Sequence, residues 1–347
     1  MVNYFFISSP LHFFVATNIA IQKTGDENIA LFISKNKQTA ELYSGAMTND
    51  SAPFSQVVLL PVNDTKNKVA NRKKCFSLIE KILEQTPADK IFTGNDARVE
   101  FQYAMYVARK QSNNVSGIYF DDGLGSYLPH RSMSSFTRKY LENFIKKLTY
   151  GNWWKSPLSL GGSQWVSEAY LAYPKLAHPL LAAKKLHKID GKAFESSTFI
   201  DICDGILQKQ TDNNKINFDN IKIIICLTHE SIYLDYEKTL LQLKAIFKDK
   251  YLPNDIAIKA HPRSKLTAPI SKVFPQATLL PSKVGLELFL PHININTLIV
   301  GDISTTLLTS KWLKPNVKVG YFEAETKAID SAGLLSLFNT LSIKCIK

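Results

Sequence analysis

Short apolar runs alternate with amphipathic segments along the first part of the chain. Each of five runs rich in β-branched or aromatic residues precedes a stretch with helical character: NYFFIS, IALFIS, QVVLLP, KIFTGN and VSGIYF. Strands that alternate with helices in this way form βαβ units, in which parallel strands make one sheet and helices cover it. The pattern therefore predicts an α/β fold.

The most apolar stretch lies at the start of the sequence, MVNYFFISSPLHFFVATNIAIQK. It lacks the basic residues that open a signal peptide, and Pro10 and His12 interrupt it well before the roughly 18 apolar residues of a membrane-spanning helix. We expect a strand over residues 2–7, a turn over 8–10 and a helix over 11–22. We expect no membrane-spanning segment elsewhere, and hence a soluble or peripheral protein.

The alternation is lost over residues 178–220, where the segment QKQTDNNKINFDN is polar and rich in Asn. A second series of strand-like runs follows: KIIICLT, DIAIKA, ATLLP, TLIVGD and VKVGYF. At 347 residues the chain is long enough for two domains. We expect two Rossmann-like domains, residues 1–190 and 221–347, joined by a connection over 191–220.

Helical spacing is clear over residues 133–149, where apolar positions recur every three to four residues and basic residues lie off that stripe. Trp153 and Trp154 follow this segment. Together they are a candidate membrane-facing element, although a core-packed helix with a solvated basic face is the plainer explanation. Two further helices are expected at about 235–247 and 304–313.

Composition is that of an ordinary globular protein, with 45% apolar and 21% charged residues. The formal net charge of +12 indicates an anionic partner, which is nucleic acid, a membrane surface, or a substrate bearing phosphate or carboxylate groups. We find no signature of an RNA-recognition, zinc-finger or helix-turn-helix module. We therefore expect no nucleic acid among the partners and keep a basic nucleic-acid-binding protein as the alternative from another class.

The four cysteines lie far apart in the sequence and form no CxxC pair. They are Cys75, Cys203, Cys226 and Cys345. Cysteines without such pairing behave as free thiols, which fits a reducing cytoplasm.

Polar side chains suited to a functional site follow five of the expected strands. In open α/β sheets ligands bind at the carboxyl ends of the strands, so the shared position of these residues matters more than any single motif. The five groups are Ser8-Ser9-Pro10-Leu11-His12, Asp121-Asp122-Gly123, Thr228-His229-Glu230-Ser231, His261-Pro262-Arg263 and Asp302-Ile303-Ser304-Thr305-Thr306.

Asp121 and Asp122 stand directly after the strand that ends at Phe120. A metal site would need further oxygen ligands, and adjacent side chains tend to diverge. One acid could instead serve as a general base while the other holds the turn, and Gly123 would let a substrate approach closely. A plain Asp-Gly turn is the third interpretation.

His261 precedes a proline, which favours extended backbone and holds the imidazole at the end of the strand. With Arg263 nearby, the imidazole suits a phosphate leaving group, and a structural histidine is the alternative. Ser304 and Thr305 open a helix whose free N–H groups would bind phosphate, although an ordinary N-cap explains the same residues.

In this order the motifs resemble those of bacterial sialyltransferases, most closely the lipooligosaccharide sialyltransferases of glycosyltransferase family 52. Several such families share an acidic-acidic-Gly motif, a His-Pro motif and a C-terminal Ser or Thr motif, which correspond here to DDG from 121, HP from 261 and STT from 304. FDDGLGSY fits the FDDGxG pattern of family 52, SPLH from residue 9 resembles its first-strand turn, and YGNWWKS is similar to its Gly-Asp-Trp segment. Polysialyltransferase families share these motifs.

The resemblance implies a GT-B fold, in which two Rossmann-like domains face a central cleft. It also implies an inverting enzyme that uses CMP-sialic acid as donor and needs no metal and no cofactor. His261 carries over as the acid or phosphate partner, Ser304 and Thr305 as phosphate binders, and Glu287 as an acid that contacts the cytidine. Further substrate-binding candidates are Ser9, Asp122, Gly123 and Arg263.

The resemblance leaves two candidates for the base that activates the acceptor hydroxyl. In related families it is the first acid of the acidic-acidic-Gly motif, which is Asp121 here. In family 52 it is an aspartate after the first strand of the second domain, where this sequence departs in residue type and has Glu230. We favour Glu230 and keep Asp121 as the close alternative. His229, the neighbour of Glu230, could also enter the site.

The resemblance therefore implies an inverting, metal-independent sialyltransferase that acts on a terminal sugar of lipooligosaccharide or capsule. A polysialyltransferase, or a GT-B transferase with another donor such as a UDP-hexose, is the alternative among enzymes. The expected partners are a CMP-sugar donor and a lipid-linked glycan acceptor, with the protein cytoplasmic or peripheral on the cytoplasmic face of the inner membrane. The sequence leaves open the linkage, the acceptor and the identity of the nonulosonic acid. It also leaves open whether the protein forms a homodimer.

Overall fold

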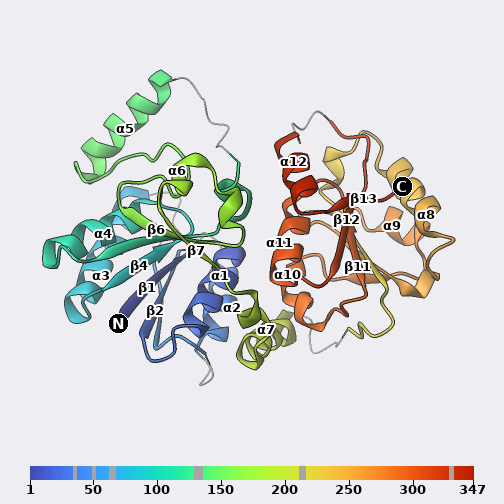
Figure 1. Ribbon diagram of the computed structural model, residues 1–347, viewed down its shortest axis with the longest axis horizontal. Helices are drawn as coiled ribbons and strands as arrows, with labels where there is room; N and C mark the ends of the chain where they lie inside the picture. Colours follow the sequence, from blue (N-terminus) through green and yellow to red (C-terminus); the bar gives the residue numbers. More distant parts are fainter. Residues whose placement is uncertain (34–36, 49–51, 62–67, 129–135, 211–215, 328–331) are drawn as a thin grey trace. The chain divides into compact units, whose positions relative to one another are not determined.

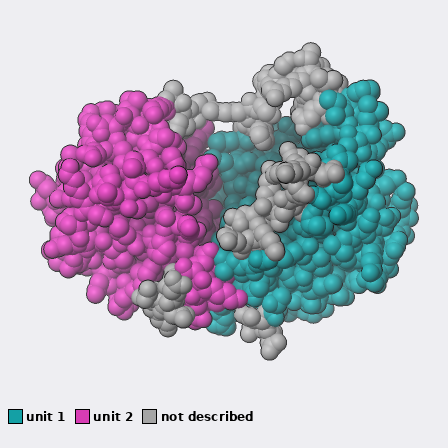
Figure 2. All heavy atoms as spheres, turned by 180° about the vertical axis from the view of Figure 1, so that it is seen from behind, with its two compact units in different colours: residues 1–202 teal, residues 203–347 magenta. Residues whose placement is uncertain are grey.

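The computed structural model describes the chain except for residues 34–36, 49–51, 62–67, 129–135, 211–215 and 328–331. The described residues form two compact units, residues 1–202 and residues 203–347 (Figure 1; Figure 2). The division falls inside helix α7 (Ser197–Gln210), a 14-residue helix that begins within the range assigned to a connection. Part of the expected connection, residues 211–215, lies outside the described residues.

A sheet of seven parallel strands, in the order β3-β2-β1-β4-β5-β6-β7, forms the centre of the first unit. The strands are β1 (Val2–Ile7), β2 (Glu27–Phe32), β3 (Gln56–Leu59), β4 (Lys90–Thr93), β5 (Ser116–Phe120), β6 (Val166–Leu171) and β7 (Lys185–Lys188). The first five are those that the apolar runs predict. The edge strand β7 lies where the alternation is lost, because its residues are exposed or half-exposed and carry no apolar signal.

Helices alternate with these strands, as the pattern of the sequence predicts (Figure 1). They are α1 (Pro10–Ile21), α2 (Lys37–Ala46), α3 (Lys68–Gln85), α4 (Val99–Gln111), α5 (Phe136–Tyr150) and α6 (Pro179–Ala182). Helix α1 is buried from His12 to Ala20, because apolar residues surround it and it packs inside the unit. The predicted start of α5 at residues 133–135 lies outside the described residues.

The second unit contains a sheet of six parallel strands in the order β10-β9-β8-β11-β12-β13. The strands are β8 (Ile223–Cys226), β9 (Ile256–Lys259), β10 (Thr278–Leu280), β11 (Leu298–Gly301), β12 (Lys318–Tyr321) and β13 (Lys344–Cys345). The helices are α8 (Tyr236–Phe247), α9 (Ala268–Val273), α10 (Leu286–Phe289), α11 (Thr305–Leu313) and α12 (Ala332–Thr340). The helices expected near 235–247 and 304–313 are confirmed.

Each sheet reverses its strand order once, at β1/β4 in the first unit and at β8/β11 in the second. Ligands of such doubly wound sheets bind outside the carboxyl ends of the strands, near the point of reversal. The central strands are buried on both faces, as parallel strands covered by helices must be: Tyr4 to Ile7 and Ile223 to Ile225 are at most 1% exposed. The rigid centre of each sheet therefore carries the loops where the candidate residues lie.

All four cysteines are free thiols. Cys75, Cys203 and Cys226 are buried, and Cys345 on β13 is partly exposed. Burial raises the pKa of Cys75 and of Cys226 to about 12 and also raises that of Cys203. These three thiols are therefore core side chains that stay protonated near neutral pH.

Trp154 is fully buried, which corrects the interpretation of the two tryptophans as a membrane-facing pair. Trp153 packs on helices α3 and α4, with ring centroids 5.7 Å from Phe76 and 6.1 Å from Tyr106. The pair therefore anchors the segment after α5 to the core. On α5 itself the exposed side chains include apolar ones: Phe144, Ile145 and Leu148 are 61%, 53% and 73% exposed.

Candidate active site

Asp121, directly after β5, has a carboxylate that accepts four hydrogen bonds and is 1% exposed. Oδ1 accepts from the backbone N–H of Gly123 at 2.9 Å and from the hydroxyl of Ser126 at 2.8 Å. Oδ2 accepts from the backbone N–H of Ala172 at 2.9 Å and from the hydroxyl of Tyr127. Burial raises the pKa of Asp121 to about 6, against the effect of these hydrogen bonds. The carboxylate joins the ends of β5 and β6 to the turn between them.

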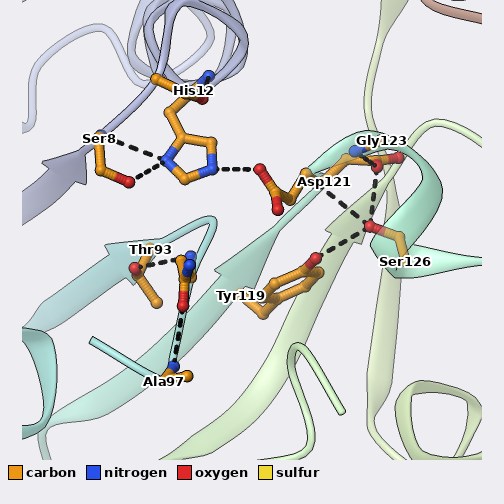
Figure 3. A network of polar contacts seen from close by, with 11 residues as sticks. Ser8, His12, Thr93, Ala97, Tyr119, Asp121, Gly123 and Ser126 are labelled. Atoms are coloured by element: carbon orange, nitrogen blue, oxygen red, sulfur yellow. Dashed lines mark hydrogen bonds and ion pairs between the residues drawn. The ribbon is translucent and has the colours of Figure 1, made fainter. Parts of the chain in front are cut away.

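Asp122 has a different environment from its neighbour. Its side chain is 25% exposed, and its Oδ1 lies 2.5 Å from Nε2 of His12, whose side chain is 2% exposed. The backbone N–H of Ser8 donates to Nδ1 of His12 at 3.3 Å, and the Ser8 hydroxyl lies 3.1 Å from the same nitrogen. Figure 3 shows the His12 ring reaching from α1, with Ser8 on one side and the turn after β5 on the other. The fold thus joins an imidazole and a carboxylate 110 positions apart.

Ser9 and Gly123 shape the backbone on either side of this pair. Ser9 is the N-cap of α1, and its hydroxyl oxygen accepts a hydrogen bond from the backbone N–H of His12 at 3.1 Å. Gly123 has φ +79°, in the left-handed region that favours glycine, and it begins a short 3₁₀ turn. In this structure both residues hold the loops that carry His12 and Asp122.

The sequence places His12 in the polar group after the first strand but predicts no role for it, and it predicts none for Gly94, which follows β4. Strand β4 lies between β1 and β5 in the sheet, and a Cβ on Gly94 would come within 2.3 Å of Nε2 of His12. The missing side chain at Gly94 leaves the space through which His12 reaches Asp122. Two features of the sequence mark these residues: the Ser-x-x-His spacing from Ser9 and the glycine that ends the KIFTG run. Neither feature indicates that His12 contacts Asp122.

In the second unit, His261 follows β9 and is half-buried. The backbone N–H of Arg263 donates to its Nδ1 at 3.1 Å, so Nε2 carries the proton of the neutral ring. Burial, together with the charges of Arg263, His229 and Lys259, lowers the pKa of His261. The ring of His229 lies 5.6 Å away between centroids. His261 therefore presents a neutral N–H donor in a cationic environment near neutral pH.

Glu230 connects the loop after β8 to the loop after β9. Its Oε1 accepts from the backbone N–H of Lys265 at 3.3 Å and lies 3.9 Å from Nε2 of His229, and the Ser264 side chain also bonds to the carboxylate. Its Oε2 is buried without a hydrogen-bond partner among the described residues. Burial acts to raise the pKa of Glu230, but these hydrogen bonds and the charge of His229 hold it below the usual value.

Ser304 is the N-cap of α11 and has extended backbone, but its side chain makes no capping hydrogen bond within the described structure. Thr305, the first residue of the helix, is exposed. The N–H groups of the first turn and the Ser304 hydroxyl are therefore available to a ligand. Because β9, β8 and β11 are adjacent in the sheet, His261, Glu230 and Ser304 follow three neighbouring strands.

Glu287 lies in α10, where its Oε2 stands 2.8 Å from the point that a Cβ of Gly285 would occupy. Burial raises the pKa of Glu287, and the charge of Lys259 opposes this effect. Lys259 is 5% exposed and donates from Nζ to the carbonyl oxygens of Ala260 at 3.0 Å and Ser282 at 2.9 Å. Lys259 thus ties the end of β9 to the loop that leads to Glu287.

Asp302, directly after β11, ties this strand to β8. Its Oδ2 accepts from the hydroxyls of Thr228 at 2.5 Å and Tyr233 at 2.6 Å, and the backbone N–H of Thr228 donates to the Tyr233 hydroxyl at 3.0 Å. A cavity of about 330 Å³ opens beside this network. It is lined by Thr228, Ile232, Asp302, Ile303, Phe322, Glu323, Ala324, Thr326 and Leu335.

Two general properties of the described residues bear on the site. None of the described clusters of His, Cys, Asp or Glu has the three or more members that could hold a metal ion. Among the helices that the structure describes, none combines the length and apolarity needed to cross a membrane. Metal independence remains a prediction.

The structure brings the predicted site residues together in two groups, one at the carboxyl edge of each sheet. The first unit holds Ser9, Asp121, Asp122 and Gly123, and the second holds Glu230, His261, Arg263, Glu287, Ser304 and Thr305. The second group offers an imidazole N–H, a guanidinium and a helix N-terminus, which suit a phosphate. The first group offers a carboxylate next to an imidazole, which suits proton transfer.

Comparison with solved structures shows the fold. UDP-GlcNAc 2-epimerase from Methanocaldococcus jannaschii is similar with a TM-score of 0.55 at 14% identity, over 98% of this chain and 92% of that chain. Another UDP-N-acetylglucosamine 2-epimerase gives a TM-score of 0.52 at 9% identity, over 96% of this chain and 80% of that one. Together with the two parallel α/β sheets of this chain, this likeness confirms the predicted GT-B fold.

Sequence comparison is specific at the level of a family. None of the curated proteins matches the chain. The family model described as alpha-2,8-polysialyltransferase (POLYST) matches residues 3–322, which include all three predicted motifs. The predicted resemblance to bacterial sialyltransferases is confirmed in this broader form, whereas the narrower assignment to family 52 stays a prediction. The chain belongs to the alpha-2,8-polysialyltransferase family of glycosyltransferases.

Proposed function

We propose that the protein transfers sialic acid, or a related nonulosonic acid, from its CMP donor to a glycan acceptor of capsule or lipooligosaccharide. The reaction inverts the anomeric centre and uses neither a metal nor a cofactor. Membership of the alpha-2,8-polysialyltransferase family supports an acceptor that itself ends in sialic acid. The enzyme adds either one sialic acid residue or many to that end. The finer proposal is a lipooligosaccharide sialyltransferase, which adds a single sialic acid residue to its acceptor.

The observation that carries this proposal is the grouping of anion-binding elements in the second unit. His261 and Arg263 follow β9, and the N-terminus of α11 with Ser304 follows β11, on the two sides of β8. A helix N-terminus attracts negative charge, and a hydroxyl not used for capping can donate to a phosphate oxygen. These elements fit a nucleoside monophosphate as the leaving group.

His261 assists the departure of CMP in this proposal. Its Nδ1 is occupied by the N–H of Arg263 at 3.1 Å, so Nε2–H is the group that donates to the phosphate. Hydrogen bonds to an ionised acceptor are about twice as strong as neutral ones, and they strengthen as charge develops on the leaving group. Arg263 and the α11 terminus share this charge, while Glu287 contacts the ribose or the base of the nucleotide.

The contacts of Glu230 and Asp121 bear differently on the choice of the base. Glu230 has a lowered pKa, which makes it a weaker proton acceptor, and its Oε1 is engaged by the backbone N–H of Lys265. Asp121 has a raised pKa, but all four of its hydrogen bonds come from its own unit and it is 1% exposed. The contacts of Glu230 therefore indicate a structural link between two loops. Those of Asp121 indicate a support for the turn after β5.

The proposal is tested by donor and product analysis. The purified protein is incubated with CMP-sialic acid and a sialylated oligosaccharide, and with UDP-GlcNAc as the competing donor. We expect CMP release with a β-donor converted to an α-linked product, unaffected by a metal chelator, and no UDP release. Release of UDP alone, or no CMP release from any CMP-nonulosonate, would overturn the proposal. Salt-dependent binding of random DNA that CMP does not alter would revive the nucleic-acid alternative.

The same proposal includes the setting of the enzyme. We propose a lipid-linked acceptor, a cytoplasmic protein and peripheral contact with the inner membrane, for which the net charge of +12 is the physical support. A homodimer is a further proposal, and light scattering of the purified chain measures it.

A further inference from the structure

Hydrogen bonding fixes the protonation of the imidazole in the first unit. A backbone N–H can only donate, so the N–H of Ser8, 3.3 Å from Nδ1 of His12, requires a lone pair on that nitrogen. The proton of the ring therefore lies on Nε2, which donates to Oδ1 of Asp122 at 2.5 Å. A second proton on Nδ1 would set two N–H groups against each other. His12 thus holds one oxygen of a carboxylate through Nε2–H.

The other oxygen of that carboxylate is open. Oδ2 of Asp122 accepts no hydrogen bond from the described residues, and the side chain is 25% exposed. Asp121 is the reverse case, with both oxygens engaged and 1% exposure. A general base must have an oxygen that the substrate hydroxyl can reach. Of the two adjacent acids, Asp122 meets this condition.

We infer that Asp122 is the catalytic base for the acceptor hydroxyl and that His12 is the positioning residue that orients it. The inference rests on the proposed sialyl transfer and departs from the two bases that the sequence predicted. The Ser8, His12 and Asp122 side chains and backbone form a chain of hydrogen bonds whose end points at solvent. A carboxylate oriented before the substrate arrives needs no reorganisation during the reaction.

In the reaction the acceptor hydroxyl donates a hydrogen bond to Oδ2 of Asp122. As its oxygen bonds to C2 of the sialyl residue, the O–H bond breaks and the proton passes to Oδ2. The bond between C2 and the phosphate oxygen breaks, and its electron pair leaves with CMP. Asp122 then returns the proton to water, and throughout this sequence Nε2–H of His12 stays on Oδ1.

The test compares the wild-type protein with the Asp122→Asn variant. The amide keeps an oxygen for the His12 N–H but cannot accept a proton, so we expect sialyl transfer to fall on the order of 10²–10⁴-fold. The dissociation constant for CMP, measured by titration calorimetry, and the midpoint of thermal unfolding should not change. Glu230→Gln and Asp121→Asn are measured in the same assay.

Two variants of His12 separate positioning from a structural role. His12→Leu removes the donor to Asp122, and we expect kcat to fall while KM for the acceptor changes little. His12→Gln supplies an amide N–H at about the reach of Nε2 and should restore part of kcat. The control is His187→Gln, because His187 forms the same kind of pair with Glu168 at 2.6 Å in this unit and should leave transfer unchanged.

The outcomes distinguish this inference from the proposed function. If Asp122→Asn transfers sialic acid as fast as the wild type, or if Glu230→Gln alone abolishes transfer, the inference is overturned and the proposed function stands. If the wild-type protein releases no CMP from any CMP-nonulosonate, both are overturned. Equal loss of kcat in His12→Leu and His12→Gln would overturn the positioning role.

Discussion

The Cα of Gly94 lies so close to the imidazole of His12 that a Cβ there would stand 2.3 Å from Nε2 and 2.6 Å from Cδ2. Real side chains do not approach this closely, so the ring and a methyl group cannot occupy the same space. The glycine at the end of β4 therefore decides whether the imidazole from α1 can reach the carboxylate after β5.

The first prediction concerns this glycine. In Gly94→Ala the added methyl must displace His12 from Asp122, and we expect transfer to fall by about 10²-fold, the cost of a misplaced catalytic group. Overpacking should also cost about 1–3 kcal/mol of unfolding free energy.

The control for this prediction is Gly162→Ala in the same unit. Its Cβ would meet the Ser159 carbonyl oxygen at 3.1 Å, away from the His12 pair. We expect a stability loss in both variants, measured by thermal unfolding, and a loss of transfer in Gly94→Ala alone. Equal transfer rates in the two variants would contradict the prediction.

The second prediction is that Asp121→Asn lowers stability far more than Asp122→Asn. Either orientation of the new amide sets its NH₂ group against two donors, for instance the backbone N–H of Gly123 and the Ser126 hydroxyl. At about 1–3 kcal/mol for each unsatisfied buried group, we expect a loss of several kcal/mol in the free energy of unfolding. Urea unfolding of both variants measures this difference, and equal midpoints would refute it.

The regular parts of the fold follow from the sequence because their signal is local. A strand such as β1 or β8 is a continuous apolar run, and helix α11 begins where Ser304 follows a strand, as expected. The edge strand β7 carries no such run, because its residues are exposed or half-exposed. The sequence therefore predicts the centres of both sheets better than their edges.

The candidate site is less predictable, because its geometry depends on distant residues. The DDG motif shows that two acids follow β5, but only the structure distinguishes Asp121, surrounded by four donors, from Asp122, held by His12. Likewise, an aromatic pair after an amphipathic helix looks the same in sequence whether it faces solvent or packs on another helix. Trp154 is the example of the second case.

The third prediction concerns proton uptake when CMP binds. The pKa of free His261 is lowered by burial and by its cationic neighbours, so the ring is neutral at pH 7. A bound phosphate brings negative charge and should raise this pKa, so binding takes up a proton on Nδ1 and the Arg263 N–H, which donates to that nitrogen in the free protein, gives up its hydrogen bond. The affinity for CMP should weaken as pH rises through the pKa of the complex.

Titration calorimetry in buffers of different ionisation enthalpy measures this uptake. It should disappear in His261→Gln and persist in His187→Gln, whose imidazole lies in the first unit. His229→Gln is measured as well, because that ring lies 5.6 Å from His261 and is the other imidazole at this edge. Uptake that survives in His261→Gln would contradict the prediction.

The fourth prediction contrasts two N-cap serines. Ser9 caps α1 through the His12 N–H at 3.1 Å, so Ser9→Ala should cost about 1 kcal/mol of unfolding free energy. Ser304 makes no capping bond within the described structure, so Ser304→Ala should change stability by less than about 0.5 kcal/mol and weaken CMP binding instead. A large stability loss without any change in CMP affinity would show Ser304 to be an ordinary cap.

The fifth prediction concerns the proposed membrane contact. Phe144 and Leu148 are 61% and 73% exposed on α5, so replacing both with Ser should leave stability unchanged and weaken binding to vesicles that contain anionic lipid. The matched control is Leu252→Ser in the second unit, where the side chain is 68% exposed. Cosedimentation measures the binding, and equal binding of both variants would exclude α5 as the contact.

Trp154→Ala completes this comparison. Because the indole is fully buried, its removal should lower the free energy of unfolding by about 3–5 kcal/mol without a specific effect on vesicle binding.

The burial of three of the four thiols offers a way to count unfolded molecules. A disulfide reagent added to the folded protein meets Cys345 at the edge of the second sheet, whereas Cys75, Cys203 and Cys226 react only after the surrounding core opens. The number of modified sulfurs per chain, read by mass spectrometry, thus rises from one to four as a population unfolds. Cys75 lies in the first unit and Cys226 in the second, so the order in which they react reports which unit opens first.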